Sequence, residues 1–216
     1  MAGPDDALVT AITGKVLVAV DGASGGRDAI ALARVLAPPS ARMVLTNVYG
    51  VGGEAGAPRS AGGLAGRALH RLARKESAEL LVVGSSHRGP TGRTMLGGQT
   101  LAALNGSSCA VGIAPRGYGM AEPDVRTVGV GDAGTAESEL AVSVARELAE
   151  RHGAALEVRA VTEGDPAEEL ATMAEHLDLL VLGSRAYGPS GRLLSGRTST
   201  QLARRAPCPL LVVPRP

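Results

Sequence analysis

Two stretches of this chain resemble each other closely, and this internal repeat restricts the fold more than any other feature. Residues 84–97 read GSSHRGPTGRTMLG, residues 183–196 read GSRAYGPSGRLLSG, and seven of the fourteen positions are identical. The match continues at the same spacing of 99 residues, from Cys109 to Cys208 and from Pro115 to Pro214. Chance does not place so many identities in one order, so the repeat predicts two similar units in tandem.

The two units also begin alike. Residues 15–21 (KVLVAVD) resemble residues 126–132 (RTVGVGD), here at a spacing of 111 residues. The extra twelve residues of the first unit fit most simply into the Gly-rich stretch 50–63. We predict a first domain at 1–117 and a second at 124–216, and a chain of 216 residues allows each its own core.

Short apolar runs alternate with amphipathic helical patterns throughout the chain. The apolar runs predict strands at 16–20, 43–48, 80–83, 111–114, 128–131, 156–161, 179–182 and 210–213. Helical spacing relates Ala29, Leu32, Ala33 and Leu36, then Ala141, Val144, Ala145 and Leu148, then Leu170, Met173, Ala174 and Leu177. We expect Thr135 and Asp165 to cap the second and third helices. The alternation predicts an α/β fold of two tandem, doubly wound parallel sheets with about four strands each.

Composition excludes several classes of function. The chain has three aromatic residues, Tyr49, Tyr118 and Tyr187, too few for a base-stacking surface. A formal net charge of +1 gives no overall field for nucleic acid or anionic lipid. Two cysteines are too few for a disulfide scaffold or a Cys-rich metal site. No apolar run reaches membrane-spanning length and the start is acidic, so we expect a cytoplasmic protein without nucleic-acid or membrane partners.

The residues suited to chemistry fall at the predicted ends of strands. Asp21 and Asp132 close the first strand of each unit, and the repeated Gly-rich loop follows a later strand. In open parallel sheets, ligands bind beyond the carboxyl ends of the strands. An aspartate there can hold a ribose hydroxyl or an adenine edge, and glycines admit a phosphate. Gly-rich loops also serve ordinary turns, so nucleotide binding and plain turn geometry are both open interpretations at this point.

Two further segments carry a resemblance to a known family. The ending APCPLLVV at 206–213 and the opening VAVDG at 18–22, with the Gly-Ser loop between strand and helix, resemble the universal stress protein family. The resemblance covers nearly the whole chain, once per unit. It implies a doubly wound α/β domain like the adenine nucleotide alpha hydrolases. It further implies, for an ATP-binding subgroup, a pattern of Gly, two residues, Gly, nine residues, Gly and then Ser or Thr.

Each unit keeps this ATP pattern only in part. The first glycine is Gly84 or Gly183 and the third is Gly97 or Gly196, but the second position holds His87 or Ala186. The hydroxyl position is Gly98 in the first unit and Arg197 in the second, and hydroxyls follow two residues later at Thr100 and Ser199. With Asp21, Asp132 and the basic Arg88, these positions form the implied adenine-nucleotide site. We expect weak ATP binding in the first unit and little in the second. The hydroxyl that would bond a phosphate is missing at Gly98 and Arg197, and each lost hydrogen bond to a charged group costs about 1.5–3 kcal/mol of binding free energy.

The lengths of the units also depart from the family, which implies five strands per copy. Each unit here lacks one strand and the helix that would follow it. Their absence removes part of the expected adenine pocket, or leaves a sheet edge for the other unit or another chain to cover. The resemblance implies that the last strands, 111–114 and 210–213, pair within the chain as an internal pseudo-dimer. A further alternative is that the whole chain pairs again as a homodimer.

The other polar residues leave alternatives or point to packing. The repeated Arg93 and Arg192 serve either phosphate contact or loop anchoring. His70, His152 and His176 have no partner at metal-ligand spacing, and Cys109 and Cys208 precede the last strand of each unit as small packing residues. No nucleophile–base set argues for an enzyme. We expect a regulatory stress-response protein with an adenine nucleotide as ligand; the alternative is an interaction module that acts through its surface without nucleotide.

Overall fold

The computed structural model describes residues 14–20, 24–47, 62–86, 89–95, 107, 109–161, 165–184 and 197–214. The strands are β1 (Lys15–Val20), β2 (Arg42–Asn47), β3 (Ala78–Gly84), β4 (Ala110–Ala114), β5 (Thr127–Asp132), β6 (Ala155–Ala160), β7 (Leu179–Gly183) and β8 (Leu210–Val213). The helices are α1 (Ser24–Leu36), α2 (Gly62–Lys75), α4 (Ala136–His152), α5 (Pro166–Met173) and α6 (Arg197–Leu202), with a short 3-10 helix, η1 (Tyr118–Met120). All eight predicted strands are therefore present, with bounds that differ by at most two residues.

The described strands form one continuous sheet in the order β2-β1-β3-β4-β8-β7-β5-β6. All neighbouring strands are parallel except the central pair, in which β4 and β8 run antiparallel with Gly112 opposite Leu211. The pairing predicted for segments 111–114 and 210–213 is thus present. The fold is α/β with a mainly parallel sheet, as predicted, and β2 and β6 are its two edge strands.

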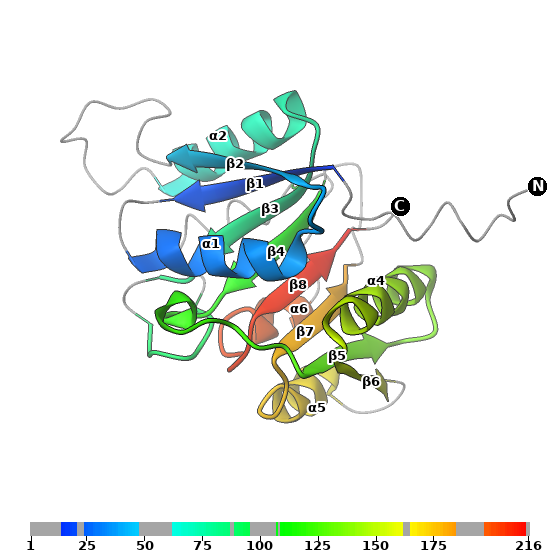
Figure 1. Ribbon diagram of the computed structural model, residues 1–216. Coiled ribbons are helices and arrows are strands. Elements are labelled where there is room, and N and C mark those ends of the chain that lie inside the picture. The colour runs from blue at the N-terminus through cyan, green and yellow to red at the C-terminus, as the bar shows by residue number, and fades with distance from the viewer. Residues whose placement is uncertain are drawn as a thin grey trace, which may run out of the picture.

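Helices cover both faces of the sheet (Figure 1). One face packs against α1 and α4, and the other against α2, α5 and α6. Within β1, Val16 and Val18 point into the first core while Leu17 and Ala19 point into the second. Each core runs without interruption from the N-terminal to the C-terminal part of the sheet. The strands are apolar at nearly every position because both of their faces are buried.

Both helix caps predicted from the sequence are present in the structure. Thr135 caps α4, and Gly153 ends it in the left-handed conformation with φ 63°. Asp165 caps α5, with Pro166 in the first turn, and accepts a hydrogen bond from the amide of Ala167. However, α5 ends at Met173, so Ala174 and Leu177 are buried in the turn that follows rather than in the helix itself.

Helix α2 was not anticipated from the sequence. Three of its first five residues are glycine, which weakens the helical pattern. The Gly-rich stretch 50–63 contributes Gly62 and Gly63 to this helix. The rest of that stretch lies outside the described residues. Among the described residues, no helix is both long and apolar enough to cross a membrane.

The connection between the two parts of the sheet is held by a buried carboxylate. Asp28 on α1 is only 2% exposed, and its two oxygens accept hydrogen bonds from the amides of Gly117 and Gly119 at 2.9 and 2.8 Å. Gly117 has φ 84°, a conformation that favours glycine, and a side chain at Gly119 would meet the Arg27 carbonyl. The connection thus turns tightly against α1 at the predicted junction near 117–123.

A second link joins the ends of α1 and α4. Helix α4 continues to His152, so its last residues reach the carboxyl end of α1. Arg151 donates a hydrogen bond to the Leu36 carbonyl at 2.8 Å, and the His152 ring lies 2.9 Å from the Val35 carbonyl. Basic side chains are favourable there because the last carbonyls of a helix carry partial negative charge. His152 is therefore an exposed residue at a helix end.

Candidate functional site

The carboxyl ends of the parallel strands are the expected ligand edges, and the chain has two of them. On the N-terminal side, β1, β3 and β4 end at Val20, Gly84 and Ala114. On the C-terminal side, β5, β7 and β8 end at Asp132, Gly183 and Val213. Because β4 and β8 are antiparallel, the two edges lie at opposite ends of the strands. Two ligand sites would therefore be separate rather than shared.

Gly84 and Gly183 end β3 and β7 directly against the first turn of a helix. A side chain on Gly84 would collide with the Gly25 carbonyl of α1, and a side chain on Gly183 would collide with the Glu137 carbonyl of α4. Backbone atoms cannot move aside as cheaply as a side chain, so both positions require glycine for packing alone. The first glycine of the expected ATP pattern is thus required for the same structural reason in both parts of the chain.

Asp132 is engaged by the start of the helix that follows it. Its Oδ1 accepts hydrogen bonds from the Gly134 amide at 2.9 Å and from the Ser138 hydroxyl at 2.8 Å. The Gly134 hydrogen bond, and then the Ser138 bond, lower the pKa of the Asp132 carboxyl below its ordinary value. The same helix start carries Glu137 and Glu139. This end of the sheet is consequently acidic, which disfavours a phosphate.

The corresponding start of α1 differs in charge. Its first turn contains no acidic residue and reads Ser24-Gly25-Gly26-Arg27. The start of a helix carries a partial positive charge and favours an anion when no acidic side chain lies there. The glutamates at the start of α4, in contrast, repel an anion. The starts of the two helices therefore differ in charge, and the first turn of α1 is the less acidic of the two.

The described part of the repeated loop, residues 89–95, packs on the C-terminal half of the chain. Its base is closed by a hydrogen bond from the Ser86 amide to the Met95 carbonyl at 2.9 Å. Next to Met95, the Thr94 amide donates to the Ala206 carbonyl at 2.8 Å, and the buried Thr94 hydroxyl lies 3.2 Å from the same oxygen. The loop of one half is thus fixed to the turn that follows α6 in the other.

Arg93 takes part in this docking. Its guanidinium donates a hydrogen bond to the Arg205 carbonyl at 3.1 Å. Of the two roles left open for Arg93 by its sequence, the structure shows loop anchoring. Arg116 supports the loop from the other side, because its guanidinium donates to the Gly89 carbonyl at 2.7 Å. Arg192, the repeat counterpart of Arg93, lies outside the described residues.

The remaining predicted site residues divide into two groups. Arg197 and Ser199 lie in α6, although their side chains are not described. The other positions lie outside the described residues, namely Asp21, His87, Arg88, Gly97, Gly98, Thr100 and Gly196. Among the described residues, the structure therefore places Gly84, Asp132 and Gly183 at the two ligand edges. Within those residues, no group of three or more His, Cys, Asp or Glu side chains gathers at metal-binding distance.

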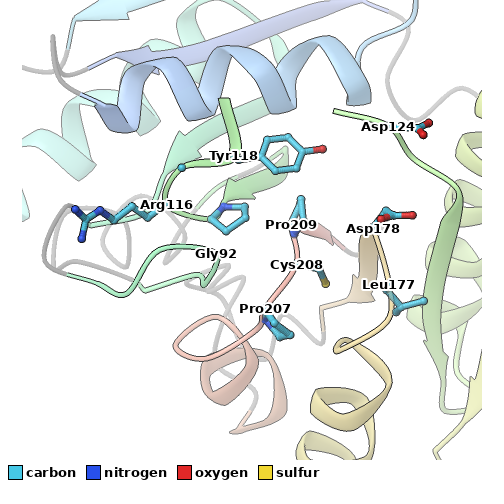
Figure 2. Close-up of a pocket in the computed structure, with 11 residues that line it drawn as sticks. Gly92, Arg116, Tyr118, Asp124, Leu177, Asp178, Pro207, Cys208 and Pro209 are labelled. Carbon is cyan, nitrogen blue, oxygen red and sulfur yellow. The ribbon is translucent and has the colours of Figure 1, made fainter. Parts of the chain in front are cut away.

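An open hollow of about 240 Å³ lies where the two parts of the sheet meet. Figure 2 shows the Tyr118 ring and the Asp178 carboxylate beside it, with Pro209 and Cys208 between them and the Arg116 side chain directed away. Asp178 Oδ2 is already occupied by the amides of Arg126 and Thr127, both at 2.9 Å. This hollow could not be predicted from the sequence, because its lining comes from segments that are far apart in the chain, near residues 92, 115–124, 177–178 and 207–209.

Burial dominates the chemistry of the residues that line the hollow. It raises the pKa of Tyr118 to about 12, with a smaller contribution from the negative charge of Asp178. It also raises the pKa of Cys208 to about 12, and that of Cys109 in the same direction. Both cysteines are free and buried, as predicted from their packing positions, and neither has the lowered pKa of a reactive thiol.

A comparison with known proteins finds a match to a family model in one part of the chain. Residues 125–214 match the model of the Universal stress protein family. A universal stress protein of Thermus aquaticus, described as lying in the QAH/OAS sulfhydrylase 3' region, is 36% identical over 77 residues. That match covers 35% of this chain and 56% of the relative, so the chain aligns with little more than half of the relative's length. The similarity to this family is thus found over residues 125–214.

Solved structures extend the comparison of the fold to nearly the whole chain. A universal stress protein from Archaeoglobus fulgidus superposes with a TM-score of 0.68 at 14% identity and covers 94% of this chain and 98% of its own. A putative universal stress protein from Pseudomonas aeruginosa gives a TM-score of 0.65 at 15% identity and covers 96% and 95%. At such low identity, these similarities show that the fold is shared.

Proposed function

We propose that the chain is a two-copy universal stress protein, with one copy at 1–117 and the other at 124–216. The mirrored strand order supports this proposal, since β2-β1-β3-β4 is followed across the sheet by β8-β7-β5-β6. The matching roles of Gly84 and Gly183 support it as well. In this arrangement the antiparallel β4–β8 pair is the interface of an internal pseudo-dimer.

The proposed role is regulatory, as part of a stress response, with an adenine nucleotide as a ligand rather than a substrate. We place this ligand in the first copy and expect ATP to bind weakly there. The observation that carries this ranking is the contrast between the helix starts. The first turn of α1 has no acidic residue, whereas the first turn of α4 contains Glu137 and Glu139. Phosphate groups favour the first environment over the second.

Calorimetric titration with ATP, ADP, AMP and a cyclic nucleotide tests the proposal, with one matched variant in each copy. Gly97→Ala and Gly196→Ala change the corresponding third glycine of the pattern. We expect binding that Gly97→Ala removes and Gly196→Ala leaves unchanged. Binding lost only in Gly196→Ala would reverse the ranking of the two copies. Phosphate release above a buffer blank would instead show an enzyme.

The second candidate is an interaction module that binds no nucleotide. A specific feature favours it, because Met43 and Leu45 expose 44% and 58% of their surface on the edge strand β2. Absence of heat with all four nucleotides, combined with self-association or partner binding through β2, would select this alternative.

A further inference from the structure

The outer side of β2 carries backbone groups that point away from the sheet. The Arg42 amide donates to the Gly14 carbonyl on the β1 side at 3.1 Å. Amide and carbonyl groups alternate in direction along a strand, so Arg42, Val44 and Thr46 face β1. Met43 and Leu45 consequently direct their amides and carbonyls outward, where β2 has no neighbouring strand among the described residues.

The same edge is also apolar on one face. The side chains of Met43 and Leu45 share the face that α1 covers elsewhere, but α1 packs on β1, β3 and β4. Both side chains are thus left exposed at the end of the sheet, where β2 lies in Figure 1. Between Met43 and Thr46 the strand has no charged residue. An edge with these properties is prone to pair with another strand.

The opposite edge of the sheet, β6, is protected against such pairing. It also exposes an apolar residue, Val158, at 46%. However, its neighbours Glu157 and Arg159 form an ion pair at 3.3 Å, and the His176 ring approaches Glu157 at 2.8 Å. Charged side chains on an edge strand oppose the approach of a second strand. The two edges therefore differ in charge although they hold equivalent places in the fold.

We propose that β2 pairs antiparallel with β2 of a second copy of this chain, around a two-fold axis at Val44. In this register, Met43 lies opposite Leu45 of the second copy, and Leu45 opposite its Met43. These are the residues whose backbone groups point outward, so they form about four hydrogen bonds across the axis. Arg42 lies opposite Thr46, so the pairing brings no like charges together.

The sequence of β2 favours a second copy of this chain as the strand that pairs with it. The pattern is self-complementary: the same two apolar side chains meet on one face, and Arg42, Val44 and Thr46 meet their counterparts on the other. Stable protein interfaces bury about 1,200–2,000 Å² in total, and one strand pair provides less than that. The dimer is therefore expected to be weak and reversible, and its formation does not depend on nucleotide binding.

Sedimentation or light scattering of the full chain over a concentration series tests the pairing. The wild type is expected to shift from monomer to dimer as its concentration rises toward about 500 µM, in the range of weak specific contacts. Leu45→Lys should remain monomeric, because it places a charge at the centre of the interface. Val158→Lys is the matched control on the other edge and should dimerise like the wild type. Circular dichroism checks that both variants are folded.

A cysteine placed at the axis tests the register. In an antiparallel sheet the Val44 pair does not exchange hydrogen bonds, so its Cα atoms lie about 4.5 Å apart, within disulfide range. Arg42 is on the same face but about 13 Å from its counterpart. Mild oxidation should thus cross-link Val44→Cys and leave Arg42→Cys monomeric, with little background from the buried Cys109 and Cys208.

Three results would overturn the proposal. The first is a wild type that stays monomeric at the highest concentration. The second is a dimer that Leu45→Lys retains, which would place the interface elsewhere. The third is cross-linking of Arg42→Cys in preference to Val44→Cys, which would exclude this register. Nucleotide titrations of the Leu45→Lys variant show whether the proposed ligand site is unaffected by loss of the dimer. Failure of one proposal can thus be distinguished from failure of the other.

Discussion

Asp28 offers the most direct test of how the two parts of the chain are joined. Its carboxylate is buried and accepts hydrogen bonds from the amides of Gly117 and Gly119. Each hydrogen bond to a charged group is worth about 1.5–3 kcal/mol, and removal of the acceptor leaves both amides unpaired. Water can reach these half-buried amides and recover part of the loss. We therefore expect Asp28→Ala to lower the free energy of unfolding by about 3 kcal/mol.

The isosteric variant Asp28→Asn separates charge and hydrogen bonding from volume. It retains one acceptor oxygen but presents an NH₂ donor to the second amide, so a loss of about 2 kcal/mol is expected. For a chain of this size, 3 kcal/mol corresponds to a drop in Tm of about 6–12 °C. Urea denaturation and calorimetry measure these changes.

Asp124 provides the control for Asp28. It pairs with Arg126 at 2.9 Å, but both side chains are at least 70% exposed. Exposed ion pairs contribute about 0–1 kcal/mol, so Asp124→Ala should leave stability nearly unchanged. If Asp28→Ala were as mild as Asp124→Ala, the buried carboxylate would not hold the connection, and the reasoning would fail.

Three further predictions follow from single contacts. Gly84→Ala and Gly183→Ala should each cost about 2–3 kcal/mol in urea denaturation, because the added methyl meets a backbone carbonyl, whereas Gly14→Ala, which meets only the Glu79 side chain, should cost under about 1 kcal/mol. Thr94→Val should cost about 1 kcal/mol through its buried hydroxyl, and the exposed Thr172→Val, which loses a hydroxyl bond to Glu168 within one helix, should cost less. Stability should fall as pH rises from about 10 toward 12, because Tyr118 ionises near 10 when unfolded and near 12 when folded. In Tyr118→Phe, the loss of stability between about pH 10 and 12 should be smaller than in the wild type. An equal loss in both proteins would show that Tyr118 is not its cause.

The sequence predicted local features of this fold well because their causes are local. The apolar runs that became strands are buried on both faces, and the caps at Thr135 and Asp165 bond within three residues of themselves. The family resemblance, rather than periodicity, supplied the β4–β8 pairing. Helix α2 was missed because local propensity argued against it, and packing on β3 overrode that propensity.

The connection between the two parts of the chain and the candidate site were less predictable, because their contacts join distant residues. Asp28 binds amides 89 and 91 residues away, and Thr94 contacts a carbonyl 112 residues away. The anchoring role of Arg93 likewise depends on Arg205, across the antiparallel junction. No spacing rule connects such pairs, so a repeated arginine in a Gly-rich loop was equally compatible with phosphate contact and with docking.

The repeat itself separates packing from ligand binding in the ATP pattern. The first glycine occurs in both copies, and in both the structure requires it, because the strand end touches a helix backbone at Gly25 or Glu137. A copy that bound no nucleotide would still need this glycine. Its presence therefore carries no information about a ligand, whereas the positions that differ between the copies, His87 against Ala186 and Gly98 against Arg197, can report one. Substitutions that exchange these positions between the copies, rather than changes at Gly84 or Gly183, are the ones that can move nucleotide affinity without moving stability.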